Sequence, residues 1–156
     1  MSHENISNNI PFNILLADDD RDDRFFFKDA LSELPITSHL TTVDDGERLM
    51  SYLLKNVYQL PDVLFLDLNM PRKNGSECLK EIKLNKEIQQ LPVIIYSTSL
   101  HEVVADELYK SGAHYYIRKT DLTELRKVLL QVLTMMAEKK FERPERNKFI
   151  LSLVEV

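Results

Sequence analysis

The sequence predicts an α/β fold in which five parallel strands form a central sheet with helices on both faces. Short apolar runs alternate with amphipathic stretches five times between residues 14 and 132. Such strict alternation of strands and helices is typical of parallel sheets. The runs at residues 14–17, 63–66 and 93–96 are apolar throughout rather than at every second position, as expected for strands that are covered on both sides.

The five expected strands are runs of apolar and β-branched residues that end at polar residues or turns. They comprise residues 14–17, 39–43, 63–66, 93–96 and 114–118. Pro61, Pro92 and Gly112 stand shortly before the third, fourth and fifth runs. Because proline and glycine interrupt helices, they separate these strands from the helices that precede them.

The first helix is expected directly after the first strand. Asp22 and Asp23 stand in its first turn, where the helix dipole favours acidic residues. Phe26 and Phe27 are expected to face the core, and Pro35 is expected to close the helix.

Four further helices are expected from apolar residues at helical spacing. These residues are Leu49, Tyr52 and Leu53; Cys78, Leu79 and Ile82; Val104 and Leu108; and Leu122, Leu125, Val128, Leu129 and Val132. Asp121 and Glu124 form a capping-box pattern at the start of the last helix.

Composition excludes several classes of protein. The chain has 156 residues, which is the length of one domain, and a net charge of −5, which argues against a nucleic-acid-binding domain. Cys78 is the only cysteine, so neither a disulfide framework nor a thiolate metal site is expected. Neither a signal peptide nor an apolar run of the ~20 residues that span a bilayer is found. A cytoplasmic protein without a membrane partner is therefore expected.

Polar side chains with matching chemistry follow the first, third, fourth and fifth expected strands. Asp18 and Asp19 follow the first strand, Asp67 follows the third, Ser97 the fourth and Lys119 the fifth. Parallel strands bring their carboxyl ends to one edge of the sheet, where ligands bind in open α/β folds. These five residues are therefore expected to lie together.

This combination of side chains is suited to phosphoryl chemistry. Three neighbouring carboxylates repel one another, and a hard divalent cation such as Mg²⁺ would stabilise them. A hydroxyl group and an ammonium group on the opposite side would complete a receptor for a phosphoryl group. A carboxylate in such a site can act as a nucleophile and form an acyl phosphate.

Four segments of the chain resemble the receiver domain of bacterial two-component response regulators. They are Ile-Leu-Leu-Ala-Asp-Asp (14–19), Asp-Leu-Asn-Met-Pro-Arg-Lys-Asn-Gly (67–75), Pro-Val-Ile-Ile-Tyr-Ser (92–97) and Gly-Ala-His-Tyr-Tyr-Ile-Arg-Lys (112–119). The resemblance implies a flavodoxin-like (βα)5 fold. Residues 41–119 are especially similar to single-domain receivers, related to chemotaxis regulators, of the kind paired with bacterial phytochromes.

The resemblance also implies roles for the residues at the acidic edge. Asp67 would take a phosphoryl group from the phosphohistidine of a sensor histidine kinase or a phosphotransfer protein. Asp19, Asp67 and the backbone carbonyl of Asn69 would ligate Mg²⁺, with Asp18 acting through water. The chain would then be a phosphoacceptor in signalling that assists its own phosphotransfer and dephosphorylation, rather than an enzyme.

Signalling by such a domain implies a change of surface. Ser97 and Lys119 would hold the phosphoryl oxygens, and Tyr116 occupies the aromatic position that moves on activation in this family. We expect the face formed by residues 104–125 to contact a downstream protein or a second copy of the chain. No direct contact with nucleic acid is expected.

The resemblance extends over residues 12–140, which are expected to form the receiver domain. Residues 1–11 are expected to be a flexible N-terminal segment, and residues 141–156 a C-terminal tail. Because residues 149–154 are mostly apolar, a strand there would bury at least one apolar face. We expect the tail to pack against a sheet edge or a helix of this chain or of a second copy.

One residue departs from the family pattern. Receivers usually have a proline after the lysine, often joined by a cis peptide bond, and here the residue is Thr120. A cis bond before a residue other than proline costs ~2.5–4 kcal/mol. Either the bond between Lys119 and Thr120 is trans and the loop is rearranged, or strain is tolerated there.

Three other functions are weighed against the phosphoacceptor. A Mg²⁺-dependent phosphohydrolase with an aspartyl-phosphate intermediate would need an acid two residues after the nucleophile, but Asn69 cannot act as a general acid. A flavin-binding protein would need a phosphate loop after the first strand, where Asp18, Asp19 and Asp20 would repel phosphate. A receiver-like adaptor that acts without phosphorylation stays open because of Thr120.

Overall fold

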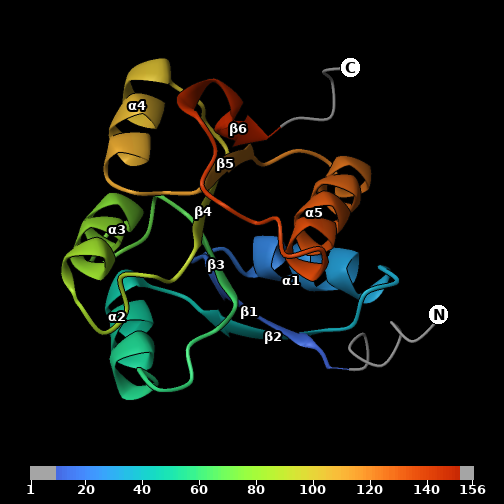
Figure 1. Cartoon of the computed structure of the whole chain (residues 1–156), viewed down its shortest axis with the longest axis horizontal. Coiled ribbons are helices and arrows are strands. Elements are labelled where there is room, and N and C mark those ends of the chain that lie inside the picture. The colour runs from blue at the N-terminus through green and yellow to red at the C-terminus, as the bar shows by residue number, and fades with distance from the viewer. Residues whose placement is uncertain (1–9, 152–156) are drawn as a thin grey trace.

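The computed structural model describes residues 10–151, which form one parallel sheet with helices on both faces (Figure 1). The strands are β1 (Phe12–Ala17), β2 (Ser38–Val43), β3 (Val63–Leu66), β4 (Val93–Ser97), β5 (Tyr115–Arg118) and β6 (Ile150–Leu151). The helices are α1 (Arg21–Ser32), α2 (Gly46–Lys55), α3 (Gly75–Leu84), α4 (Glu102–Lys110), α5 (Leu122–Ala137) and the 3₁₀ turn η3 (Arg146–Lys148). The predicted alternation of five strands and five helices is confirmed.

The strand order is β2-β1-β3-β4-β5-β6, and every neighbouring pair is parallel. The chain moves outward from β1 to β2 and then returns to the other side of β1 to form β3. The order of the strands therefore reverses between β1 and β3, where the loops leave a crevice beyond the carboxyl ends of the strands.

Two apolar layers hold the helices to the sheet. Figure 1 shows α1 and α5 on one face and α2, α3 and α4 on the other. In the first layer the Phe27 ring packs edge-on against Phe65 at 4.9 Å and against Tyr96 at 5.5 Å between ring centroids. In the second layer Leu49 and Leu79 are fully buried with the apolar residues of β1, β3 and β4. Both faces of the central strands are thus covered, as their apolar sequences predict.

The sheet has one strand more than the sequence predicts. Residues Ile150 and Leu151 form β6, which pairs with Tyr116 and Ile117 at the edge of β5. The C-terminal tail therefore docks on a sheet edge of its own chain, as expected. The rest of the expected tail strand, and most of the N-terminal segment expected to be flexible, lie outside the described residues.

Helix α1 differs from the prediction in two ways. It ends at Ser32 rather than near Pro35. Phe26 is 49% exposed, so the prediction that it faces the core is wrong. The buried residues of α1 are Phe27, Ala30 and Leu31, and Phe26 lies just outside that stripe, about 100° from Phe27 and about 40° from Ala30 on the helix surface.

The helix caps also differ in detail. Asp121 accepts a hydrogen bond from the Glu124 N–H at the start of α5, which is one half of the predicted capping box. A complete capping box forms instead at the start of α3, between Asn74 and Glu77. Among the described helices, none combines the length and the apolar character that crossing a bilayer requires.

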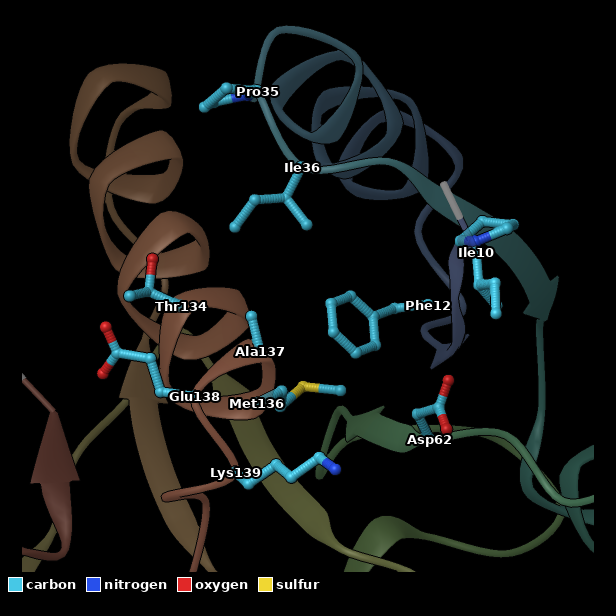
Figure 2. A pocket seen from close by; sticks show the side chains of 11 residues that line it. Ile10, Phe12, Pro35, Ile36, Asp62, Thr134, Met136, Ala137, Glu138 and Lys139 are labelled. Atoms are coloured by element: carbon cyan, nitrogen blue, oxygen red, sulfur yellow. The ribbon is translucent and has the colours of Figure 1, made fainter. Parts of the chain in front are cut away.

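A cavity of about 520 Å³ opens at the amino edge of the sheet (Figure 2). Phe12 and Ile36 line it from the strand side, and Met136 lines it from the end of α5. Asp62 and Lys139 stand at its margin with exposed side chains. It lies at the edge of the sheet opposite to the one where the polar residues were predicted to meet.

Candidate functional site

Buried polar residues of the described chain gather at the carboxyl edge of the sheet. They are Asp18, Asp45, Asp67 and Ser97. Asp18 and Asp67 directly follow β1 and β3, and Ser97 ends β4. Buried carboxylates are rare unless they are paired or bind a cation. Their presence marks this edge as the candidate functional site.

Asp18, Asp19 and Asp67 form an acidic cluster. Each offers a carboxylate oxygen, and these oxygens all lie within 4.8 Å of one another. Burial is the main reason why the pKa of Asp67 is raised to about 6, and the negative charge of Asp18 adds to that effect. A set of oxygen ligands with an excess of negative charge is what a hard divalent cation requires. The cluster predicted from the strand ends is therefore suited to binding such a cation.

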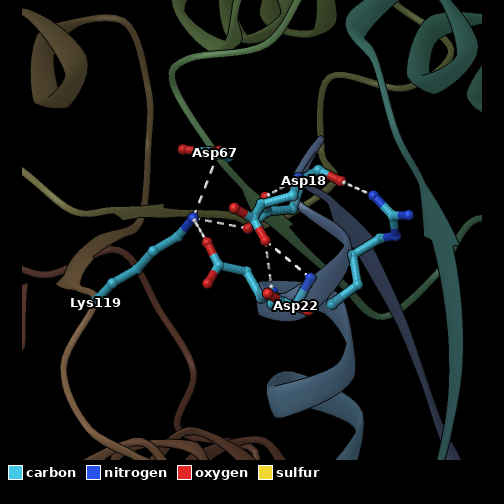
Figure 3. Close-up of polar contacts among 7 residues, drawn as sticks. Asp18, Asp22, Asp67 and Lys119 are labelled. Carbon is cyan, nitrogen blue, oxygen red and sulfur yellow. Dashed lines mark hydrogen bonds and ion pairs between the residues drawn. The ribbon is translucent and has the colours of Figure 1, made fainter.

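Lys119 points from the end of β5 into the acidic cluster (Figure 3). Its Nζ lies 2.7 Å from Asp18 Oδ2, 2.8 Å from Asp23 Oδ2 and 3.5 Å from Asp67 Oδ2. Burial alone would lower the pKa of Lys119, but the hydrogen bonds to Asp18 and Asp23 outweigh it and raise this pKa. The ammonium group is thus held charged in the place where the sequence predicts it.

The backbone after Lys119 takes the simpler of the two expected forms. No cis peptide bond occurs within residues 10–151, so the bond between Lys119 and Thr120 is trans. The Lys119 N–H donates to the Ser97 carbonyl at 2.7 Å, and its Nζ lies 5.0 Å from the centre of the Tyr96 ring. With Thr120 in place of the usual proline, Lys119 therefore still points into the acidic cluster.

The neighbouring acidic residues in the loop after β1 make different contacts. Asp18 points inward, and its Oδ1 accepts the Asp20 N–H at 2.9 Å. Asp20 caps α1 by accepting the N–H groups of Asp22 and Asp23 at 2.8 and 3.1 Å. Arg24 Nη1 donates to the Asp18 carbonyl at 2.8 Å and so ties the loop to the first turn of α1.

Asp23 is the residue at this edge that the sequence reasoning missed. It was expected only to complement the dipole of α1, yet it forms one of the shortest contacts of Lys119. The available signal was its position in the first turn of a helix that begins at the same sheet edge. Spacing along the chain does not reveal that Lys119, almost a hundred residues later, reaches it.

Close backbone packing positions Asp67. Its N–H donates to the Ala17 carbonyl at 2.9 Å, which joins the ends of β1 and β3. The backbone of Asn69 acts on the Asp67 carboxyl in the direction that lowers its pKa, although burial outweighs this effect. Ligation of a cation by the Asn69 carbonyl stays a prediction. A Cβ atom at Gly75 would come within 2.3 Å of the Asp67 carbonyl oxygen. Glycine at the start of α3 therefore permits this turn.

Ser97 ends β4 opposite Arg118 of β5, and Tyr116 lies two residues earlier on β5, opposite Ile95. Ser97 is fully buried, and its Oγ has no hydrogen-bond partner within the described residues. The Tyr116 hydroxyl donates to the Ser99 carbonyl, two residues beyond Ser97. Tyr116 is 1% exposed, so it is a buried aromatic residue and not part of the outer surface.

The face formed by residues 104–125 is partly covered by the end of the chain. Phe149 is fully buried there, edge-on to Tyr109 and Tyr116 at 5.2 and 6.2 Å between ring centroids. Arg146 forms ion pairs with Asp106 and Glu102 of α4. The surface expected to contact a partner thus already contacts the chain's own C-terminal segment.

Known proteins with related sequences share this arrangement of elements. Response regulator Rcp1 of Synechocystis sp. is 32% identical over 116 residues, which cover 72% of this chain and 79% of Rcp1. The crystal structure of the manganese-bound form of Rcp1 superposes with a TM-score of 0.73 at 29% identity, covering 86% of this chain and 100% of that one.

Two further crystal structures are similar over most of their length. The phosphorylated cyanobacterial phytochrome response regulator RcpA has a TM-score of 0.74 at 28% identity and covers 87% of this chain and 100% of its own. The CheX–CheY complex of Borrelia burgdorferi with beryllofluoride and Mg²⁺ has a TM-score of 0.70 at 28% identity, with coverages of 85% and 94%.

The family model of the response regulator receiver domain matches residues 14–130. That range includes Asp18, Asp67, Ser97 and Lys119, the residues that meet at the carboxyl edge. With the sequence identity to Rcp1 and the parallel sheet, the match shows the family. The chain belongs to the receiver domains of two-component response regulators.

Proposed function

We propose that Asp67 of this receiver domain accepts a phosphoryl group from a sensor histidine kinase or a phosphotransfer protein. The observation that carries this proposal is the position of the Asp67 carboxylate, within one cluster with Asp18 and Asp19 and 3.5 Å from Lys119 Nζ. The groups that would serve as the nucleophile, the cation ligands and the counter-charge for the phosphoryl group thus lie at one edge.

The transfer forms an acyl phosphate on the protein. An oxygen of the ionised Asp67 carboxylate attacks the phosphorus of a phosphohistidine and forms a new O–P bond. The N–P bond breaks, its electron pair returns to the imidazole ring, and the ring takes up a proton. Because the pKa of Asp67 is about 6, the carboxylate is mostly ionised above neutral pH and can act as the nucleophile.

Asp18, Asp19, Asp67 and the backbone carbonyl of Asn69 are the groups that would hold Mg²⁺. When bound, the cation would neutralise charge on the transferring phosphoryl oxygens. Asp19 is exposed whereas Asp18 and Asp67 are buried, so water can complete the coordination from the side of Asp19. Mg²⁺ commonly binds through one or two carboxylates and keeps several waters.

Ser97 and Lys119 would hold the phosphoryl oxygens. The Ser97 hydroxyl is buried without a partner, and a phosphoryl oxygen would accept its hydrogen bond. Lys119 now pairs with carboxylates and would also pair with the added negative charge. We propose that movement of Ser97 toward the phosphoryl group is transmitted to Tyr116, and that these two residues form the switch.

The phosphodonor would approach beside α1. Phe25 and Phe26 are 64% and 49% exposed on that helix. Phe26 and Tyr96 line a hollow of about 230 Å³ that also contains Lys119. An apolar surface beside the phosphoacceptor is suited to binding a protein partner. The phosphoryl group ends on the chain itself, so we regard the protein as a phosphoacceptor and not as an enzyme.

Phosphorylation by acetyl phosphate with Mg²⁺, followed by mass spectrometry of the intact protein, tests this function. The wild type should gain one phosphoryl group that hydroxylamine removes, because acyl phosphates are cleaved by it. The Asp67→Asn variant should gain none, and chelation of Mg²⁺ should prevent the reaction of the wild type.

Asp20→Asn is the matched control, since asparagine also caps helices well and the same charge is removed nearby. It should be phosphorylated like the wild type. Equal phosphorylation of Asp67→Asn would refute the site. An unmodified wild type under all conditions would favour an adaptor that acts without phosphorylation.

A further inference from the structure

Three acids of the described chain contact Lys119, and one of them lies outside the proposed cation site. Asp18 and Asp67 belong, with Asp19, to the cluster whose oxygens lie within 4.8 Å of one another. Asp23 is not a member of that cluster, although its Oδ2 lies 2.8 Å from Lys119 Nζ. It comes from the first turn of α1 rather than from the end of a strand. Asp23 is therefore an acid that holds the lysine without being needed for a cation.

The contacts of Lys119 with its three acids are unequal. An ammonium group has three N–H donors. Two of them form short hydrogen bonds, at 2.7 Å to Asp18 and 2.8 Å to Asp23, whereas Asp67 Oδ2 lies 3.5 Å from Nζ. Lys119 is thus bound more closely to its two other partners than to the carboxylate that would carry the phosphoryl group.

The contact between Lys119 and Asp23 is held firmly in place. The Lys119 side chain is 9% exposed and that of Asp23 is 30% exposed, so water does not readily replace the carboxylate as a partner for the ammonium group. Asp20 accepts the Asp23 N–H at 3.1 Å and fixes the first turn of α1. The dipole of α1 stabilises a negative charge in that turn. Lys119 therefore gives up Asp23 only for another anion.

We propose, on the basis of the function proposed for Asp67, that Asp23 is a positioning residue that competes with the phosphoryl group for Lys119. With Asp18 and Asp67 engaged at the cation site, Asp23 is the remaining carboxylate partner of the lysine. To pair with phosphoryl oxygens on Asp67, the ammonium group gives up part of its contact with Asp23. The residue thereby weakens the hold of the site on a phosphoryl group.

The charge of Asp23 acts in opposite directions on the two ligands of the site. It opposes an added anion, because it attracts Lys119 and repels the phosphoryl oxygens. It favours an added cation, because it offsets the positive charge of Lys119 beside the cluster. Removal of this charge should therefore strengthen the binding of a phosphoryl group and weaken the binding of Mg²⁺. Loss of a merely structural contact would instead loosen the site and weaken both.

Binding of beryllofluoride, a phosphoryl mimic, tests the competition directly. Fluorine NMR of the full chain at saturating MgCl₂ gives its affinity. Asp23→Asn should bind the mimic about fivefold or more tightly than the wild type, because a nearby negative charge is lost from a partly buried site. Asp23→Ser, which also lacks the charge, should show the same gain. Asp23→Glu keeps the charge and should stay close to the wild type.

Asp22→Asn is the matched control for net charge. Asp22 stands in the same turn of α1, is exposed, and is not among the acids that contact Lys119. In ~1 M KCl the Debye length falls to about 3 Å, so removal of this charge should leave the affinity for the mimic unchanged. The gain in Asp23→Asn should persist, because charges in direct contact are screened much less.

Titration with MgCl₂ alone, followed by amide NMR, gives the second readout. Asp23→Asn should bind Mg²⁺ about twofold or more weakly than the wild type. Opposite changes in the two affinities would support competition for Lys119. If Asp23→Asn loses affinity for both ligands, the residue is only structural and the proposal is wrong.

The same titrations separate failure of this proposal from failure of the proposed function. If the wild type does not bind the mimic, the phosphoacceptor proposal fails. If the wild type binds it and the neutral variants of Asp23 bind it equally or more weakly, competition by Asp23 is wrong and the function of Asp67 stands. An equal gain in Asp22→Asn at high KCl would also overturn the role of Asp23.

Discussion

The two edges of the sheet differ in whether their charged side chains are buried or exposed. At the carboxyl edge, Asp18 and Asp67 are buried and close to each other. At the amino edge, Asp62 and Lys139 stand at the margin of an apolar cavity and stay exposed. Burial of charge costs free energy. The buried carboxylates at the carboxyl edge therefore lower the stability of the fold, although they form the candidate site. The predictions below test that difference.

The largest effect on stability should come from the apolar core between the edges. Phe27 is fully buried between Phe65 and Tyr96. Phe27→Ala should therefore lower the free energy of unfolding by about 3–5 kcal/mol, because it removes the ring and leaves a cavity. Denaturant unfolding measures this change. Phe25→Ala, at an exposed position of the same helix, should change it by less than about 0.5 kcal/mol, and similar losses in both would contradict this view of the core.

Neutralising Asp67 at the carboxyl edge should instead raise the free energy of unfolding. The pKa of Asp67 is raised from 3.8 to about 6 in the folded protein, so the ionised carboxylate is less favourable in the fold than in the unfolded chain. Without Mg²⁺, Asp67→Asn should raise the free energy of unfolding by about 1–3 kcal/mol above pH 6. The gain should fade as the pH falls from 6 towards 3.8, where both states of the wild type are protonated.

Asp62→Asn is the control at the amino edge. Asp62 is exposed and its Oδ2 accepts the Asn13 N–H at 2.7 Å. Its neutralisation should bring no gain in stability. A gain of equal size in Asp62→Asn and Asp67→Asn would mean that the change reports the net charge of the chain rather than the carboxyl edge.

Much of the fold follows from periodicity alone. Continuous apolar runs predict β1, β3 and β4, because strands buried on both faces need apolar residues throughout. Periodicity does not predict that Ile150 and Leu151 pair with β5, since a two-residue strand is defined by its neighbour. It also misplaces Phe26, because this residue lies at the margin of the buried stripe of α1, where a small rotation about the helix axis decides between core and solvent.

The candidate site is predictable to the extent that it consists of strand ends. Asp18, Asp67 and Lys119 come together because parallel strands bring their carboxyl ends to one edge. The contact of Lys119 with Asp23 depends on where the first turn of α1 begins, and that depends on Asp20 as its cap. Contacts between a loop and a helix start are therefore beyond reasoning from spacing.

Binding of Mg²⁺ should offset the loss of stability that the buried carboxylates at the carboxyl edge cause. A ligand that binds only the folded state adds about 1.4 kcal/mol at ten times its Kd. The melting temperature of the wild type should rise with MgCl₂, and that of Asp67→Asn should rise much less. KCl at equal ionic strength controls for screening of surface charge. Equal increases in both proteins would place the bound cation away from the cluster of Asp18, Asp19 and Asp67.

The smallest effect at neutral pH should arise beside the start of β5, at the amino edge. The Nδ1 of His114 is buried without a partner within the described residues, and its ring stacks on Phe141 at 5.6 Å. Burial, together with the positive charges of Lys83 and Arg143, lowers its pKa from 6.5 to about 4. Protonation therefore opposes folding, and this cost develops as the pH falls from 6.5 to 4.

The two edges should then respond to acid in opposite directions over nearly the same range. Between pH 6.5 and 4 the cost at His114 grows, while the cost of ionised Asp67 is relieved. The wild type should show a flat profile of unfolding free energy against pH. His114→Gln should become more stable on acidification, and Asp67→Asn should lose about 2 kcal/mol near pH 5. His39→Gln, at an exposed histidine, is the control, and parallel profiles for all four proteins would show that neither group governs the response.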